Sequence, residues 1–286
     1  MTYFDHLSNV YRSVIQQVMA DPAQLPSLPA STFELRKAVQ NPDLGNEALA
    51  AICSRDPGFV ALLVSAVASP LYNRAHPPST VSAIVGVLGR EKVDRLAMVY
   101  SIKSLFVFRS IRMKKVYSQV WERAVLTSGI SALLAKKYTR VNVEEVLMAG
   151  LLIELGTLAI LSALKEVSDF PSTDEFDQLC KEYGKSLAAI MLKKWMLDDQ
   201  VIHVIKSSGC WFDSLSDQLS IADVVNLGLY CALKRTNSGH QLPPITEVAA
   251  YRKLPQAAQV VDRYGILAVV NDHEEEIRSI QKLLAV

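Results

Sequence analysis

The sequence has no excess of charge of either sign, and it is poor in glycine and proline. Its 286 residues carry 30 Lys and Arg against 29 Asp and Glu, so no overall field attracts nucleic acid or an anionic membrane. With 12 glycines and 12 prolines it is neither collagen-like nor of low complexity. A hydrophobic fraction of 50% excludes intrinsic disorder, because so much apolar surface can be buried. The length indicates one large globular domain or two of modest size.

The chain also has few cysteines, and none of them stands at metal-binding spacing. Cys53, Cys180, Cys210 and Cys231 form no CxxC or CxxH pair, which argues against a zinc knuckle or a disulfide framework. We expect them to be reduced and mostly buried. The first 20 residues carry Asp5 and amphipathic spacing instead of basic residues before an apolar core. We therefore expect no signal peptide and a cytoplasmic protein.

One apolar run, Val146–Leu164, is long enough to cross a bilayer as a single helix. Glu154 lies at its centre and Gly156-Thr157 follows, and a carboxylate in the middle of a membrane costs several kcal/mol. The run is therefore predicted to form two core helices or one bent helix. A buried Glu154 must then find a hydrogen-bond donor or stay protonated.

Helix signals recur along the whole chain, whereas Asn-Gly and Asp-Gly hairpin turns are absent. Apolar residues recur at spacings of three and four, and the loops are short. The sequence therefore predicts a compact all-α fold. Helix starts are expected at five places, and Gly184 is expected to mark a helix boundary; the starts are the Ser31–Glu34 capping box, Asn46, Asp56-Pro57, Ser79-Thr80 and the Ser172–Glu175 capping box.

The C-terminal part is expected to be a helical tail. The stretch Thr236–Ile245 is the best candidate for a linker, and Ala257–Tyr264 and His273–Leu284 are predicted to be helices. A further domain boundary is predicted near residues 104–118, where the apolar run gives way to basic residues.

Several short motifs occur in a recognisable order. They are LPSLP at 25–29, Asp56-Pro57, Ala68-Ser69-Pro70-Leu71-Tyr72 and Leu88-Gly89. In this order and at these gaps the sequence resembles the HDOD family over about residues 20–235. The resemblance implies an N-terminal helix at 1–19, the N-terminal half of the HDOD domain at 20–110, an HD-like helical half at 111–235 and a C-terminal helical tail at 246–286.

HDOD domains are all-helical relatives of the HD metal-dependent phosphohydrolases. The resemblance implies a site that, in those relatives, uses a His, an adjacent His-Asp pair and a distant Asp around one or two divalent ions. Imidazole and carboxylate groups bind the metal, and the metal-bound water loses a proton and attacks phosphorus.

This sequence departs from that pattern at each ligand position. Gly150–Gly156 resembles the G-L-L-H-D-I-G motif, with Ile153 in place of His and Glu154 in place of Asp. The helix that would offer the first His begins Trp121-Glu122-Arg123-Ala124, and no histidine occurs between His76 and His203. The positions of two later histidines and of the last Asp also differ. We expect a vestigial pocket and no bound metal or other cofactor; its residues are Arg123, Ile153, Glu154, Ser207, Ser208 and Leu229.

The histidines and acids support the same expectation without the resemblance. The chain has 5 histidines, none of them followed by Asp, and only His203 is placed on a core-type helix. A lone histidine there is more often structural than a ligand. Glu154 with Asp198 or Asp223 could offer only a weak Mg²⁺-like site made of carboxylates.

The densest basic segment lies at 109–117. Its cationic residues, with Phe106, Phe108 and a tyrosine interleaved, could grip phosphates and stack a base, or could bind an acidic protein. A run of charge is more often a solvated face, and we do not expect nucleic acid to be the partner. The candidate residues are Arg109, Arg112, Lys114, Lys115 and Tyr117.

The expected function is that of a non-catalytic signalling or regulatory HDOD protein, acting through protein contacts or by sensing a small ligand. The resemblance implies partners of the cyclic-di-GMP or two-component type, and no membrane association is expected. Two alternatives stay open: a metal-dependent phosphohydrolase with an atypical ligand set, and a nucleotide or nucleic-acid binder that uses the 109–117 segment. The tail after residue 245 either covers the HD-like half or pairs two copies of the chain.

Overall fold

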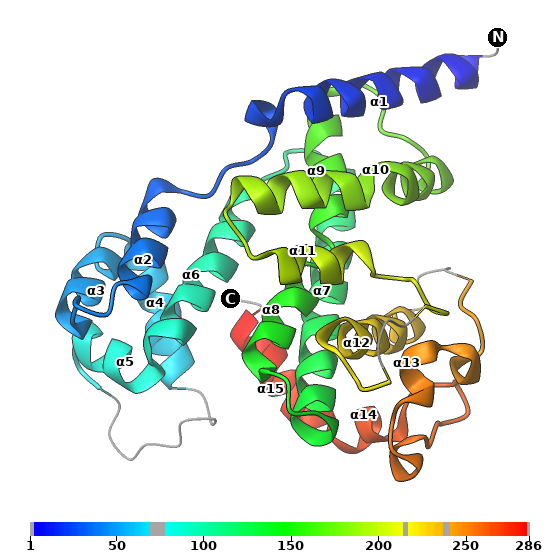
Figure 1. Cartoon of the computed structure of the whole chain (residues 1–286). Helices are drawn as coiled ribbons and strands as arrows, with labels where there is room; N and C mark the ends of the chain where they lie inside the picture. Colours follow the sequence, from blue (N-terminus) through cyan, green and yellow to red (C-terminus); the bar gives the residue numbers. More distant parts are fainter. Residues whose placement is uncertain (1–2, 69–77, 214–216, 237–240, 285–286) are drawn as a thin grey trace. The chain divides into compact units, whose positions relative to one another are not determined.

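The computed structural model describes residues 3–68, 78–213, 217–236 and 241–284, which form helices and loops (Figure 1). No β-strand occurs in these ranges; an isolated bridge joins Val261 and Leu267. The predicted all-α fold is confirmed. The chain divides into two compact units, a smaller one of Ser27–Val107 with Ser279–Val286 and a larger one of Met1–Pro26 with Phe108–Arg278.

Between residues 27 and 107, the described part of the smaller unit contains five helices, and side-chain caps begin two of them. They are α2 (Ala30–Gln40), α3 (Asn46–Cys53), α4 (Pro57–Val67), α5 (Val81–Leu88) and α6 (Arg90–Leu105). Asp56 Oδ1 accepts hydrogen bonds from the amides of Gly58 at 2.9 Å and Phe59 at 3.1 Å at the start of α4. Thr80 Oγ1 accepts from Ala83 N at 3.2 Å at the start of α5. The predicted starts of α3, α4 and α5 are confirmed, while motif residues 69–72 lie outside the described ranges.

The predicted capping box at Ser31–Glu34 is wrong. Helix α2 begins two residues earlier than predicted, at Ala30, and its N-cap is Pro29 without a side-chain cap. The Pro29 carbonyl already accepts the amide of Thr32, so Ser31 lies inside the helix. The Glu34 carboxylate pairs with Arg55 Nη1 at 2.7 Å and does not reach back to the helix start.

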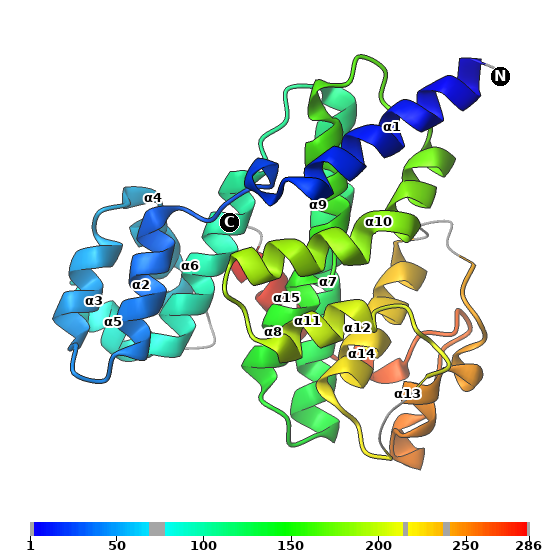
Figure 2. The same cartoon turned by 45° about the horizontal axis from the view of Figure 1, so that its top comes forward.

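In the larger unit, the 28-residue helix α7 (Ile111–Tyr138) packs against α8 (Val143–Leu152), α9 (Leu155–Ala163) and α12 (Ile221–Arg235), as Figures 1 and 2 show. Glycines allow these helices to approach closely. A Cβ on Gly150 would lie 2.8 Å from Ser128 Cα, and one on Gly228 would lie 2.0 Å from Ser131 Oγ. The remaining helices of this unit are α1 (Tyr3–Ala20), α10 (Thr173–Lys194), α11 (Asp199–Lys206), α13 (Ala249–Arg252) and α14 (Ala268–Asp272); α15 (Glu274–Leu284) begins in it.

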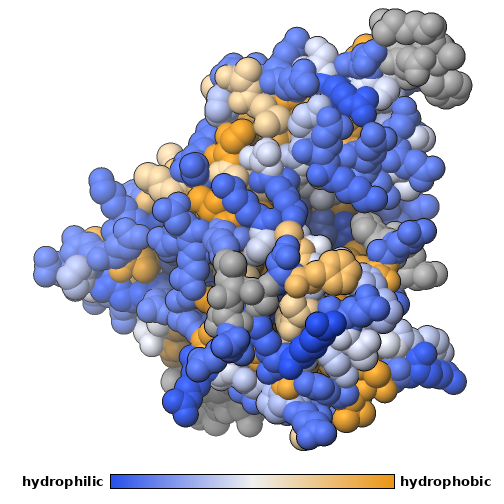
Figure 3. All heavy atoms as spheres, turned by 45° about the vertical axis from the view of Figure 1, so that its right-hand side comes forward, coloured by the Kyte–Doolittle hydropathy of each residue, from blue (hydrophilic) through white to orange (hydrophobic). Residues whose placement is uncertain are grey.

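The long apolar run forms two core helices, as predicted. Helix α8 ends at Leu152 and α9 begins at Leu155, so the chain turns at Ile153 and Glu154. The segment Val143–Glu166 has the length and composition of a membrane span, but 72% of its apolar window is buried inside the protein. On the face shown in Figure 3, hydrophilic residues predominate and apolar residues form small, separate groups.

Helix α10 starts as predicted but does not end at Gly184. The Ser172–Glu175 capping box is present, with Glu175 N donating to Ser172 Oγ at 3.3 Å and Ser172 N donating to Glu175 Oε2 at 3.0 Å. Gly184 lies within the helix, at the point where α9 crosses α10. A Cβ on Gly156 of α9 would lie 2.1 Å from the Gly184 carbonyl oxygen.

The C-terminal segment is helical only in part. Helix α15 confirms the predicted helix at 273–284. The predicted helix at 257–264 is wrong: a short 3₁₀ turn at Gln256–Ala258 is followed by extended chain and a turn. Asp262 Oδ1 accepts the amides of Tyr264 at 2.8 Å and Ile266 at 2.9 Å, and Gly265 has a φ of 76°. Residues 237–240 of the expected linker lie outside the described ranges.

Candidate vestigial site

The break between α8 and α9 places Glu154 at the N-cap of α9, with its side chain pointing into the larger unit. The residue is 7% exposed. Its Oε1 accepts a short hydrogen bond from Arg123 Nε of α7, and its Oε2 accepts one from Thr157 Oγ1 at 2.9 Å. Each carboxylate oxygen therefore has a donor, as the sequence requires of a buried glutamate.

Arg123 and Glu154 form a buried ion pair. Their side chains are 14% and 9% exposed. Burial lowers the pKa of the Arg123 guanidinium, but the neighbouring acidic groups, Glu154 foremost, more than offset this effect, so the pKa is raised. The guanidinium is thus a permanent cation beside the carboxylate.

Thr157 and Cys180 also belong to this site, and neither was predicted as a site residue. Burial raises the pKa of the Cys180 thiol, and the negative charges of Glu154 and Asp177 raise it further. The thiol therefore stays protonated and does not act as a nucleophile. Thr157 follows Glu154 by three residues, one turn along α9, so its contact was readable from the sequence. Cys180 comes from α10, and no local pattern places it here.

The other predicted pocket residues do not offer metal ligands. Ile153 has no donor atom and packs on the hydrophobic core of the larger unit. Leu229 is buried on α12. Ser207 Oγ donates to the carbonyls of His203 at 2.9 Å and Val204 at 3.0 Å.

Ser208 is held in the same way, at the end of α11. Its Oγ donates to the Ile205 carbonyl at 2.7 Å. Asn226 of α12 fixes this helix end, because its Nδ2 donates to Ser207 O at 3.1 Å and its Oδ1 accepts Gly209 N at 2.8 Å. The structure therefore brings Arg123 and Glu154 together and places the two serines in a separate hydrogen-bonded group.

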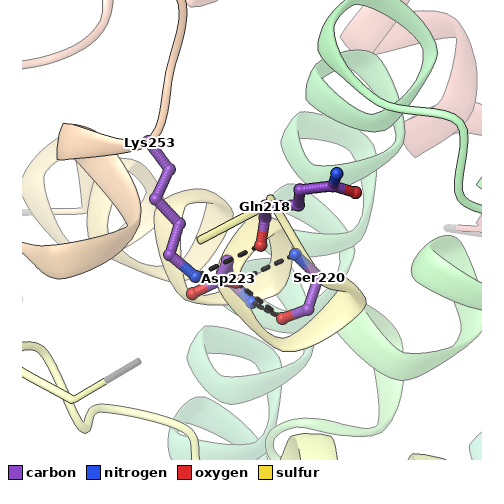
Figure 4. Close-up of polar contacts among 4 residues, drawn as sticks. All are labelled: Gln218, Ser220, Asp223 and Lys253. Carbon is purple, nitrogen blue, oxygen red and sulfur yellow. Dashed lines mark hydrogen bonds and ion pairs between the residues drawn. The ribbon is translucent and has the colours of Figure 1, made fainter. Parts of the chain in front are cut away.

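Asp223, the other buried carboxylate considered as a cation ligand, has a basic partner of its own (Figure 4). Lys253 Nζ lies 2.9 Å from Asp223 Oδ2 and 3.2 Å from the Gln218 carbonyl oxygen. Asp223 also completes the capping box of α12, accepting Ser220 N at 2.9 Å. The residue that follows α13 is thereby tied to the start of α12.

The residues present do not fit a divalent metal of the HD type. The described residues contain no group of three or more His, Cys, Asp and Glu side chains arranged for a metal. His203 is exposed on α11. A guanidinium occupies one side of Glu154, and an arginine cannot be a metal ligand because it keeps its proton.

The basic segment at 109–117 is only partly available to a ligand. Arg112 donates to the carbonyls of Phe170 at 3.2 Å and Pro171 at 2.8 Å. Tyr117 stacks on Trp121 with 6.2 Å between ring centroids, and burial raises its pKa to about 12. Arg109, Arg112, Lys114 and Lys115 are all exposed, and Arg112 is the one that donates to backbone carbonyls.

Comparison with known proteins identifies the family of this chain. The HDOD domain profile matches residues 25–209. A protein of Shewanella amazonensis SB2B named "Putative metal-dependent phosphohydrolase" is similar in structure, with a TM-score of 0.71 and 18% identity, over 95% of this chain and 99% of that one. An HDOD domain protein with unknown function from Geobacter sulfurreducens has a TM-score of 0.64 and 19% identity, over 96% of this chain and 97% of that one.

This chain spans only part of the length of two further relatives. A "Putative signal transduction protein" of Marinobacter aquaeolei VT8 has a TM-score of 0.58 and 18% identity, over 98% of this chain and 66% of that one. An uncharacterized protein of Treponema pallidum (strain Nichols) is 24% identical over 194 residues, which are 64% of this chain and 37% of that protein. Sequence identities this low show only that the folds are similar. The HDOD profile, in contrast, matches more than half of the chain and shows its family. The chain belongs to the HDOD domain family.

Proposed function

We propose that this protein is a non-catalytic HDOD regulator that acts in cytoplasmic signalling, through contacts with other proteins or by sensing a small ligand. The observation that carries the proposal is the buried Arg123–Glu154 pair. In the HD relatives the corresponding carboxylate position serves a divalent cation. Here the positive charge beside the carboxylate belongs to the chain itself.

The pair argues against metal-dependent hydrolysis, which needs a carboxylate oxygen free to bind the metal and a bound metal that activates water. Glu154 has no oxygen without a donor, because Arg123 and Thr157 occupy both. A metal would have to displace the guanidinium and leave it buried without a partner, which costs several kcal/mol. Without a bound metal, no water near this site is activated at neutral pH.

The name of the Marinobacter relative supports a role in signalling, and the name of the Shewanella relative supports the alternative, hydrolysis. For the first role, we propose partners of the cyclic-di-GMP or two-component type. For the basic segment at 109–117, the half-buried Tyr117 already stacks on Trp121, which disfavours stacking on a base, so an acidic protein is the better candidate partner for its exposed cations.

A hydrolysis assay separates the two roles. The purified chain is incubated with bis(p-nitrophenyl) phosphate and Mn²⁺, Mg²⁺ or Fe²⁺, and we expect no release of nitrophenol above the protein-free rate. The variants Glu154→Gln and Glu122→Gln are assayed in parallel, since Glu122 is an exposed glutamate of α7. Hydrolysis that is lost in Glu154→Gln and kept in Glu122→Gln would show that the protein is an enzyme.

A further inference from the structure

The smaller unit contains a pocket that the proposed function does not use. It lies among α2, α3, α4 and α6 and has a volume of about 110 Å³. Two of the motifs behind the family resemblance meet there, since Pro29 ends LPSLP and Asp56 begins Asp56-Pro57. Ser31 and Ser104 at its edge are exposed, so the pocket opens to solvent.

Asp56 is the only charged side chain among the residues that line this pocket. Its Oδ1 accepts three hydrogen bonds, from the amides of Gly58 and Phe59 and from Tyr100 Oη at 3.0 Å. No donor of the described residues reaches its Oδ2. The neighbouring Arg55 does not neutralise it, because that guanidinium pairs with Glu34.

Four hydroxyl groups of the pocket, those of Thr32, Tyr100, Ser101 and Ser104, have already committed their protons. Ser101 Oγ donates to the Ala97 carbonyl at 2.7 Å, so in the 2.5 Å contact with Thr32 Oγ1 the threonine must donate. Ser104 Oγ donates to the Ser101 carbonyl at 2.8 Å. Burial raises the pKa of the Cys53 thiol to about 11, so the thiol is neutral. The hydroxyls named here can therefore only accept hydrogen bonds from a ligand, and the Asp56 carboxylate beside them is a further acceptor.

The remaining walls are apolar. Leu35, Ile52, Phe59 and Ala97 line the pocket, and the Phe59 ring lies 5.7 Å from the Tyr100 ring between centroids. A cavity of about 150 Å³ holds a benzene molecule, so the present volume suits about four to five non-hydrogen atoms. Such walls match an alkyl stem better than a hydrated inorganic cation.

We propose that this pocket binds a primary ammonium group on a short alkyl stem, with the ammonium at Asp56 Oδ2 and the stem against the apolar walls. The same chemistry is offered by a free alkylamine and by a lysine side chain of a partner protein. The proposal is independent of the Arg123–Glu154 pair, which lies in the larger unit.

The test is a titration of the ¹⁵N-labelled full chain, followed by NMR. The amides of Gly58 and Phe59 report on the site because they donate to Asp56. We expect n-butylammonium to shift both signals with saturation at millimolar concentration. The uncharged n-butanol is expected to cause no saturable shift.

Three variants make the test specific. Asp56→Asn keeps a side-chain oxygen that caps α4 but lacks the charge, and we expect its dissociation constant to rise at least tenfold. Asp43→Asn makes the same chemical change at an exposed acid outside the pocket and should leave binding unchanged. Ala97→Leu fills the pocket without changing its charge and should abolish binding, which tests the site independently if Asp56→Asn does not fold.

A second arm uses Nα-acetyl-lysine methylamide. Binding of both amines supports a site for any short alkylammonium, binding of the lysine derivative alone supports a partner's lysine, and binding of n-butylammonium alone supports a free amine. The proposal is overturned if neither amine gives a saturable shift, if n-butanol binds equally well, or if folded Asp56→Asn binds as tightly as the wild type.

Discussion

Glu154 and Asp223 are buried carboxylates of the larger unit, and each is matched by a basic side chain of its own. Arg123 reaches Glu154 from α7, and Lys253 reaches Asp223 from the segment after α13. Charges that leave water need partners, and here the partners come from the chain. The consequence is that removal of one partner affects folding.

The first prediction concerns the Arg123–Glu154 pair. Glu154→Gln leaves a buried guanidinium without a counter-charge and should lower the free energy of unfolding by about 3–5 kcal/mol. Arg123→Met should cost a similar amount, because it leaves the carboxylate buried alone. The double variant should be more stable than the sum of the two losses implies. Urea denaturation measures all three variants, with Glu122→Gln as the exposed control; additive losses would contradict the coupling.

The second prediction concerns Cys231, because burial raises the pKa of its thiol to about 11. The fold favours the neutral thiol, so this contribution to stability is fully present below about pH 9 and is lost as the pH rises towards 11. The free energy of unfolding should therefore fall between pH 9 and pH 10.5, and less steeply in Cys231→Ala. Equal slopes in urea unfolding of the two proteins would refute this assignment.

At the scale of the residue, the sequence predicted that buried Glu154 needs a hydrogen-bond donor, but it did not predict which residues donate. It required a donor for Glu154, and the structure supplies two. The proximity of Thr157 follows from helical spacing, whereas Arg123 is 31 positions away and meets Glu154 only through the packing of α7 against α8 and α9. Long-range contacts of this kind leave no local signal.

At the scale of the element, the crossing of α9 and α10 depends on Gly156. The two backbones lie so close there that no side chain fits at Gly156, whereas a Cβ on Gly184 would meet its nearest atom at 3.9 Å. Gly184 lies inside α10 at this crossing, although glycine often marks a helix end.

The third prediction tests this crossing. Gly156→Ala would place a Cβ 2.1 Å from the Gly184 carbonyl oxygen and should lower the free energy of unfolding by about 3 kcal/mol, at the upper end of overpacking costs. Gly86→Ala is the matched control, because Gly86 lies on the exposed side of α5 and its nearest contact is the flexible Asn46 side chain at 3.3 Å. Thermal unfolding of both variants measures the difference, and an unchanged Gly156→Ala would mean that the helices do not cross so closely.

Three of the helix starts with a side-chain cap were predicted, and so was the start of α3, which has none. Asp56, Thr80 and Ser172 each bond the backbone as expected. At α2 the Ser31–Glu34 pattern was misleading, because Pro29 already ends the extended chain and begins the helix. At 257–264 the apolar spacing was overridden by the turn that Asp262 and Gly265 stabilise.

At the scale of the whole molecule, composition and periodicity were sufficient for the all-α class, and the ordered motifs were sufficient for the family. The pocket of the smaller unit was not predicted. Its residues come from four helices, and Asp56 reads in the sequence simply as a helix cap. The domain limits at 19, 110, 235 and 246 remain predictions.

The fourth prediction concerns metal dependence of the whole fold. A ligand that binds only the native state raises its stability, so a protein with a resident divalent ion melts earlier in the presence of a chelator. For this chain we expect the melting temperature to be the same, within about 1 °C, in EDTA and in millimolar Mn²⁺. An increase with Mn²⁺ that disappears in Glu154→Gln would indicate a metal at the vestigial site.

Crystals soaked in Mn²⁺ and measured near the manganese absorption edge give the most direct test of the Arg123–Glu154 assignment. We predict an ordered guanidinium against the Glu154 carboxylate and no anomalous peak within coordination distance of that carboxylate. A manganese peak bound to Glu154, with the Arg123 side chain turned away, would contradict the account.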